Sequence, residues 1–292
     1  MLARAARSTL SLPSRGIEIA LLDFGGDGPL ALLHHATGFC KGVWAPIAER
    51  LRTRFHVVAM DARGHGDSSI VEGAASYAWL EFIRDLTAVV EALAREHGGV
   101  ALGVGHSFGG TAMLGAGKAR PDLLRRLVLA DPVVPWPAAA QDDAAARPNL
   151  LAEGARRRRT EWPSLADARA SWGERSVFKT WSRDILDLYA LDGLRERADG
   201  SVTLKCPSAV EAAIFDRGRD LDVASIVQDH PVPTLWLRAG QGHFPEDWCR
   251  SLAGRMRACE FRELDAGHLM VMEQPELVSA EVLRFSGEAT EA

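Results

Sequence analysis

Apolar residues along the chain follow two periodicities that alternate with each other. Continuous apolar runs, typical of buried strands, are expected at 17–24, 30–34, 55–60, 126–130, 233–238 and 260–264. Between them, apolar residues lie three and four positions apart and predict amphipathic helices at 44–53, 77–97, 245–257 and 272–285. Strands that alternate with helices favour a mainly parallel sheet covered by helices on both faces, an α/β fold.

This alternation stops between residues 132 and 227, where no clear strand is found and the helical stretches are rich in Arg, Ala, Asp and Trp. Four of the eight tryptophans fall in this block: Trp136, Trp162, Trp172 and Trp181. Because tryptophans at that density need apolar surface to cover, the block predicts a helical cap. We expect a core part at 1–135, the cap at 136–229 and a second core part at 230–292.

The composition is that of a globular protein, with 47% hydrophobic and 25% charged residues in 292. Lys and Arg number 34 and Asp and Glu 39, a net charge of −5, so nucleic acid is not expected as a partner. The basic run 156–159 is interpreted as a solvated helix face. No apolar run is long enough to cross a membrane.

Compartment and targeting depend on weaker features. The four cysteines, at 40, 206, 249 and 259, have neither zinc-site nor disulfide-framework spacing, so free thiols in the cytoplasm are expected. The basic N-terminus resembles a transit peptide in composition but lacks the apolar stretch of a secretory signal. We prefer a first strand near Thr9–Leu12.

A glycine-rich motif, Gly105-His106-Ser107-Phe108-Gly109, links an apolar run to a helix-forming segment that extends to about residue 119. A sharp strand-to-helix turn strains its central residue and brings backbones close together, so the positions two before and two after must be small. The turn would hold the Ser107 hydroxyl at the helix N-terminus, where developing negative charge is stabilised. We therefore expect Ser107 to be a nucleophile.

A serine hydroxyl needs a base, and His268 is the candidate among nine histidines. It follows the last predicted strand and so belongs at the sheet edge that carries the strand-to-helix turn of Ser107. His106 adjoins Ser107 but should point elsewhere, and His65 is expected to make structural hydrogen bonds in a glycine-rich loop.

Two residues are candidates for the carboxylate that orients His268. The turn after 233–238, the usual position, reads Ala-Gly-Gln-Gly-His-Phe and holds no acid. Asp131 directly follows the strand at 126–130, whereas Asp247 lies where the next helix begins and is typical of a first-turn acid. We prefer Asp131 to Asp247, with anchoring of the start of the cap as the alternative role for Asp131.

An acyl-transfer site also needs two donors for the oxyanion. One is expected to be the N–H of Phe108, directly after the nucleophile. The other is expected from the loop 35–38, where the small residues Ala36 and Gly38 let the backbone approach a substrate; we select the N–H of Thr37.

With these motifs in order, the chain resembles the α/β-hydrolase fold family over nearly its whole length. The matching segments are His35-Ala36-Thr37-Gly38, Asp61-Ala62-Arg63-Gly64-His65-Gly66-Asp67-Ser68, Gly105–Gly110 and Gly267-His268. The resemblance implies Ser107 as nucleophile and His268 as base, and members with an acid after the sixth strand are similar around Asp131. Ser107 argues against the members that use aspartate as nucleophile. The chain departs from the family at Ala36, usually glycine, and in lacking the acid after the seventh strand.

These residues predict a serine hydrolase that cleaves carboxylic esters through an acyl-enzyme, with no metal or cofactor. The cap is similar to that of a lipase-like branch of the family found in fungal peroxisomes and bacteria. Its tryptophans favour a substrate with an apolar acyl chain, an aromatic ester or a lactone. The alternatives are acyl transfer or C–C bond hydrolysis on the same residues, and a ligand receptor without turnover. Oligomeric state is left open.

Overall fold

A central eight-stranded sheet organises the computed structural model, which describes residues 1–135, 149–218 and 220–287. The strand order is β1-β2-β4-β3-β5-β6-β10-β11, and all neighbours from β4 to β11 are parallel. Its strands are β1 (Ala6–Leu12), β2 (Ile17–Gly25), β3 (Leu30–His34), β4 (His56–Met60), β5 (Leu102–His106), β6 (Leu127–Ala130), β10 (Thr234–Ala239) and β11 (Cys259–Leu264). The predicted mainly parallel sheet and the first strand are confirmed.

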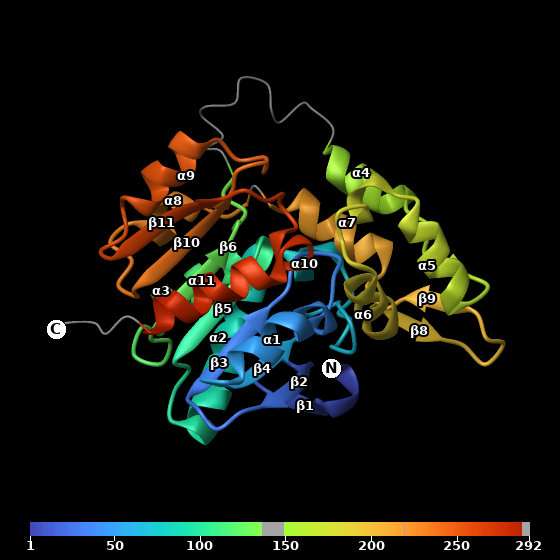
Figure 1. The fold of residues 1–292 in the computed structure, drawn as a ribbon, viewed down its shortest axis with the longest axis horizontal. Coiled ribbons are helices and arrows are strands. Elements are labelled where there is room, and N and C mark those ends of the chain that lie inside the picture. The colour runs from blue at the N-terminus through green and yellow to red at the C-terminus, as the bar shows by residue number, and fades with distance from the viewer. Residues whose placement is uncertain (136–148, 219, 288–292) are drawn as a thin grey trace.

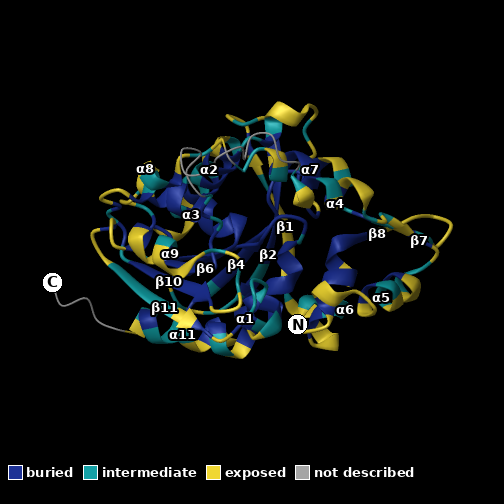
Figure 2. Ribbon diagram, turned by 90° about the horizontal axis from the view of Figure 1, so that it is seen from above, coloured by how far each residue is buried: buried dark blue, intermediate teal, exposed yellow. Residues whose placement is uncertain are grey.

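Helices cover both faces of this sheet (Figures 1 and 2). One face packs against α1 (Ala45–Leu51), α10 (Met270–Glu273) and α11 (Pro275–Gly287). The other packs against α2 (Trp79–His97), α3 (Phe108–Ala119), α8 (Val223–Val227) and α9 (Glu246–Ala253). The two apolar layers explain why the parallel strands are continuous apolar runs, since both of their faces are buried.

The cap segment, from α4 to α7, lies beside the carboxyl ends of these strands (Figure 1). It contains α4 (Leu150–Arg157), α5 (Leu165–Gly173), α6 (Arg183–Gly193) and α7 (Ser208–Asp216). The expectation of no strand here is wrong, because β7 (Glu161–Trp162), β8 (Leu194–Glu196) and β9 (Val202–Leu204) form a small antiparallel sheet. Strands of two or three residues are too short to show an alternating pattern. The predicted boundary at 136 lies outside the described residues.

The tryptophans of the cap segment are buried, as their density indicated. Trp172 stacks on Tyr189 with ring centroids 4.7 Å apart, and Trp162 packs edge-on against Trp172. Trp181 is 7% exposed and meets Phe178 edge-on. Trp136 lies outside the described residues. These rings join the apolar layer on one face of the sheet, so the cap segment shares its core with the sheet.

The helix predicted at 272–285 is in fact two helices, α10 and α11, separated at Gln274. Pro275 opens α11, because a proline has no N–H to continue α10 and suits a first helical position. The described residues also form short 3-10 helices: η1 (Leu2–Arg4), η2 (Lys41–Trp44), η3 (Ala74–Tyr77) and η6 (Ser176–Phe178). Among the described residues, no helix combines the length and apolar character needed to span a membrane.

Candidate active site

The turn between β5 and α3 strains Ser107, whose φ is 56°. A Cβ on Gly109 would lie 2.5 Å from the His34 carbonyl oxygen, and one on Gly105 would meet the Gly109 backbone. Glycine is thus required on both sides of Ser107 because the backbones of β3, β5 and α3 converge there. The strained serine is only 6% exposed.

Ser107, His268 and Asp131 form one hydrogen-bonded chain at the carboxyl ends of β5, β11 and β6. Ser107 Oγ lies 2.9 Å from His268 Nε2, and His268 Nδ1 lies 2.6 Å from Asp131 Oδ2. Asp131 is 2% exposed, and its φ of 43° is a second strained non-glycine backbone conformation. Strain of this kind persists where surrounding structure enforces it, often at functional sites. The structure therefore brings together the nucleophile, base and preferred acid that the sequence predicts.

The turn after β10, which lacks an acid, receives the carboxylate of Asp131 instead. The Ala239 N–H donates to Asp131 Oδ1 over 3.0 Å. A Cβ on Gly242 would lie 3.0 Å from Asp131 Oδ2. Asp247 is exposed in the first turn of α9, and no hydrogen bond joins it to His268 in the described part of the chain. The geometry thus supports Asp131 over Asp247.

The two predicted oxyanion donors lie in the first turn of α3 and in the loop after β3. Phe108 is the first residue of α3, so its N–H has no acceptor within the helix. Thr37, 8% exposed, lies in the loop after β3, the strand that pairs with β5. Neither N–H has an acceptor among the described residues. Both are therefore free to bind a substrate oxygen.

Four histidines around this site are buried, and burial lowers the pKa of each. We call them the buried histidines: His34 (pKa about 4), His35 (pKa well below its usual value), His65 (about 4) and His106 (about 3). His65 makes structural hydrogen bonds, as expected. Neutral imidazoles can donate from one nitrogen and accept at the other.

His106 has a role that sequence reasoning missed. Its Nε2–H donates to the backbone carbonyl of His268 over 2.8 Å. This contact joins the end of β5 to the loop after β11, although β6 and β10 separate those strands in the sheet. Its position directly before Ser107 was the one sequence signal, and it was interpreted only as pointing away from the serine.

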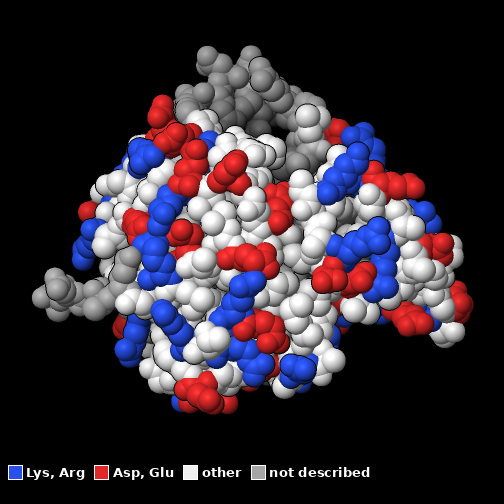
Figure 3. All heavy atoms as spheres, in the orientation of Figure 1, with Lys and Arg blue, Asp and Glu red and all other residues white. Residues whose placement is uncertain are grey.

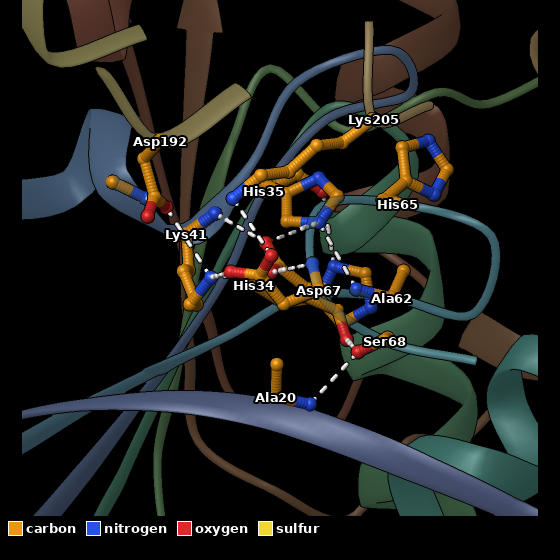
Figure 4. A network of polar contacts seen from close by, with 12 residues as sticks. Ala20, His34, His35, Lys41, Ala62, His65, Asp67, Ser68, Asp192 and Lys205 are labelled. Carbon is orange, nitrogen blue, oxygen red and sulfur yellow. Dashed lines mark hydrogen bonds and ion pairs between the residues drawn. The ribbon is translucent and has the colours of Figure 1, made fainter. Parts of the chain in front are cut away.

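A cluster of charged residues, of which Lys41, Asp61 and Asp192 are buried, lies beside the loop 35–38 (Figure 4). Lys41, 1% exposed, contacts Asp61, Asp67 and Asp192 at 2.5, 3.0 and 3.3 Å. Burial raises the pKa of Asp61 to about 6 although Lys41 opposes the shift. Arg7 pairs with Asp192 and Lys205 with Asp67. Since Asp192 and Lys205 belong to the cap segment, this charge cluster connects the cap segment to the sheet.

Among the described residues, no group of three or more His, Cys, Asp or Glu side chains is arranged so that it could hold a metal ion. Acid and basic side chains intermix over the face drawn in Figure 3, without the extended basic surface that nucleic acid requires. A serine hydroxyl next to a histidine that is itself hydrogen-bonded to a carboxylate has the contacts that a serine nucleophile needs.

Known proteins are similar to this chain in sequence or in structure. The 2-(acetamidomethylene)succinate hydrolase of Mesorhizobium japonicum is 36% identical over 122 residues, 40% of this chain and 42% of the relative. The match thus spans less than half of that relative. The solved structure of an E-2-(acetamidomethylene)succinate hydrolase has a TM-score of 0.80 at 22% identity, covering 96% of this chain and 98% of the other. The peroxisomal α/β-hydrolase Lpx1 of Saccharomyces cerevisiae has a TM-score of 0.75 at 18% identity, covering 96% and 87%.

At 22% and 18% identity, these two solved structures show that their fold is also the fold of this chain. A model of the alpha/beta hydrolase family matches residues 31–281, which include all but the first residue of β3, the strands from β4 to β11, and Ser107, Asp131 and His268. The predicted family and fold are confirmed: the chain belongs to the alpha/beta hydrolase family.

Proposed function

We propose that this protein hydrolyses carboxylic esters through an acyl-enzyme on Ser107. The hydrogen-bonded chain from Ser107 through His268 to Asp131 carries the proposal, since it supplies a nucleophile, a base and an orienting acid. The Ser107–His268 contact is 2.9 Å long and the His268–Asp131 contact 2.6 Å.

In the first half-reaction, Ser107 Oγ attacks the ester carbonyl while His268 Nε2 takes the hydroxyl proton. The N–H groups of Thr37 and Phe108 bind the oxyanion, and Asp131 stabilises the imidazolium. Collapse of the resulting tetrahedral intermediate breaks the bond between the acyl carbon and the alcohol oxygen. The alcohol leaves with the proton from His268. Water then attacks the acyl-enzyme by the same route, releasing the acid and restoring Ser107.

An apolar acyl group, aromatic ester or lactone fits the surroundings of the loop 35–38. Phe39 directly follows this loop, and its ring lies 5.5 Å from Trp181 and 5.3 Å from Tyr189. A Cβ on Gly38 would lie 3.5 Å from Arg158 Nη1, and Glu211 pairs with this guanidinium. A neutralised guanidinium beside aromatic rings favours an uncharged acyl group.

The name of the Mesorhizobium relative supports a second candidate, hydrolysis of an acylaminomethylene group on a dicarboxylate. The same nucleophile would serve, but the substrate's carboxylates would need a cation released from its ion pair. Acyl transfer and C–C bond hydrolysis also use this residue set, and a receptor would bind a ligand at this site without turnover.

A panel of esters with graded acyl length tests the proposal, together with an acylaminomethylene dicarboxylate. We expect turnover of apolar esters and a loss of kcat on the order of 10⁶-fold in Ser107→Ala. The control is Ser279→Ala, which removes a buried hydroxyl from α11. Cleavage of the dicarboxylate alone selects the second candidate. Full ester hydrolysis by Ser107→Ala refutes the acyl-enzyme.

A further inference from the structure

The loop that carries Thr37 is held in place by side chains on three sides. From the core, His35 Nδ1–H donates to the Ala36 carbonyl over 2.7 Å, and the Gly38 N–H donates to His65 Nε2 over 3.0 Å. The third contact comes from the cap segment: the Tyr189 hydroxyl donates to the Gly38 carbonyl over 2.9 Å. Both polar groups of Gly38 are thus bound, one from the core and one from the cap segment.

Tyr189 is itself fixed by charged neighbours. Its hydroxyl oxygen accepts a hydrogen bond from Arg158 Nη2 at 3.3 Å, and Arg158 pairs with Glu211. The tyrosine is 1% exposed in α6 and packs between Trp172 and Phe39. Arg158 is therefore not part of a solvated basic face, which corrects the interpretation of the run 156–159. A donor that also accepts from a cation is polarised and donates more strongly.

The backbone of Gly38 has a left-handed conformation, and its orientation depends on these hydrogen bonds. Its φ is +81°, and a Cβ there would lie 2.5 Å from Glu211 Oε1. A glycine in this conformation has few intrinsic restraints, so its hydrogen bonds determine how the adjoining peptides are oriented. The Thr37 N–H lies two peptide units before the Gly38 carbonyl, in the unit whose own carbonyl, that of Ala36, accepts from His35.

We propose that Tyr189 is a positioning residue for the oxyanion-binding loop, with its hydroxyl holding the Gly38 carbonyl so that the Thr37 N–H faces the substrate. This inference rests on the proposed function. It makes the catalytic rate depend on the seating of the cap segment against the core, since the cap segment supplies one of the three contacts that hold the loop.

The experiment compares Tyr189→Phe with Tyr77→Phe, the only two tyrosines in the chain. Tyr77 also donates its hydroxyl to a backbone carbonyl, that of Val71, over 2.8 Å, so the control removes the same group from the same kind of contact. We expect Tyr189→Phe to lower kcat about fivefold to tenfold, with KM unchanged, because one net hydrogen bond is lost. Affinity for a trifluoromethyl ketone, which forms an oxyanion on the serine, should fall by the same factor.

A second readout needs no turnover. Amide exchange of residues 36–39 should accelerate in Tyr189→Phe and stay unchanged in Tyr77→Phe. Wild-type enzyme that hydrolyses no ester refutes the proposed function, while exchange still reports on the contact. Unchanged kcat and ketone affinity in Tyr189→Phe overturn the inference and leave the proposed function standing, as does an equal loss of kcat in Tyr77→Phe.

Discussion

Replacing Asp131 with asparagine tests which acid orients His268. In the structure, Asp131 Oδ2 accepts from His268 Nδ1 and Asp131 Oδ1 accepts from the Ala239 N–H. An asparagine has one oxygen for these two donors. If the oxygen stays with Ala239, the amide nitrogen donates to His268 Nδ1, and the imidazole proton moves to Nε2, where it blocks proton transfer from Ser107.

In the reverse orientation the asparagine oxygen accepts from His268 Nδ1–H, which keeps the productive tautomer. The amide NH₂ then faces the buried Ala239 N–H, and two donors meet without an acceptor. Leaving that donor unsatisfied costs about 1–3 kcal/mol, so the unproductive orientation dominates. Losing the charge opposite the imidazolium costs about a further 1.5–3 kcal/mol, the contribution of a charge-assisted hydrogen bond. We therefore expect kcat/KM to fall by about 10²- to 10⁴-fold.

The assay is hydrolysis of a chromogenic ester by equal amounts of folded protein, verified by thermal unfolding. Asp247→Asn is the matched control, since it makes the same chemical change at an exposed position. It should keep wild-type activity. A loss of less than tenfold in Asp131→Asn, or a loss confined to Asp247→Asn, would refute the reasoning.

Three other changes test the surroundings of the site. Gly242→Ala should lower kcat while the protein still folds, because the new methyl lies 3.0 Å from Asp131 Oδ2; wild-type kcat would contradict this contact. The buried histidines have folded pKa values below the unfolded value of about 6.5, so the unfolded chain binds more protons and stability falls as pH drops from about 6.5 toward 4. Urea unfolding should therefore show a loss of up to about 1.4 kcal/mol per pH unit for each histidine, whereas a flat profile between pH 7 and 5 would show that they are protonated when folded. Lys41→Met should destabilise the fold by about 3–5 kcal/mol in the same assay, because it leaves Asp61 and Asp192 without their buried cation; a change under 1 kcal/mol would mean that water or Arg7 compensates.

The core of the fold could be predicted because its signals are local and strong. Continuous apolar runs indicated the parallel strands, and three- and four-residue spacing indicated α2. The cap segment was harder to interpret, because β7 is two residues long and its partners three. The apolar spacing continues through the break before Pro275, and only the proline itself marks the start of a new helix.

Candidate site residues that lie at strand ends were accessible from the sequence, since topology brings those ends to one edge. Ser107, Asp131 and His268 are of this kind, and the structure places them in hydrogen-bond contact. Supporting contacts were not accessible. Tyr189 meets Gly38 across 151 residues, and no local pattern indicates which carbonyl a distant hydroxyl will find.

Mass spectrometry of the intact protein, quenched in acid during turnover of an apolar ester, tests the acyl-enzyme most directly. The account predicts an added mass equal to the acyl group, located on the peptide that contains Ser107 and absent from Ser107→Ala. Ester hydrolysis without that adduct, or an adduct on another residue at the same rate, would contradict it.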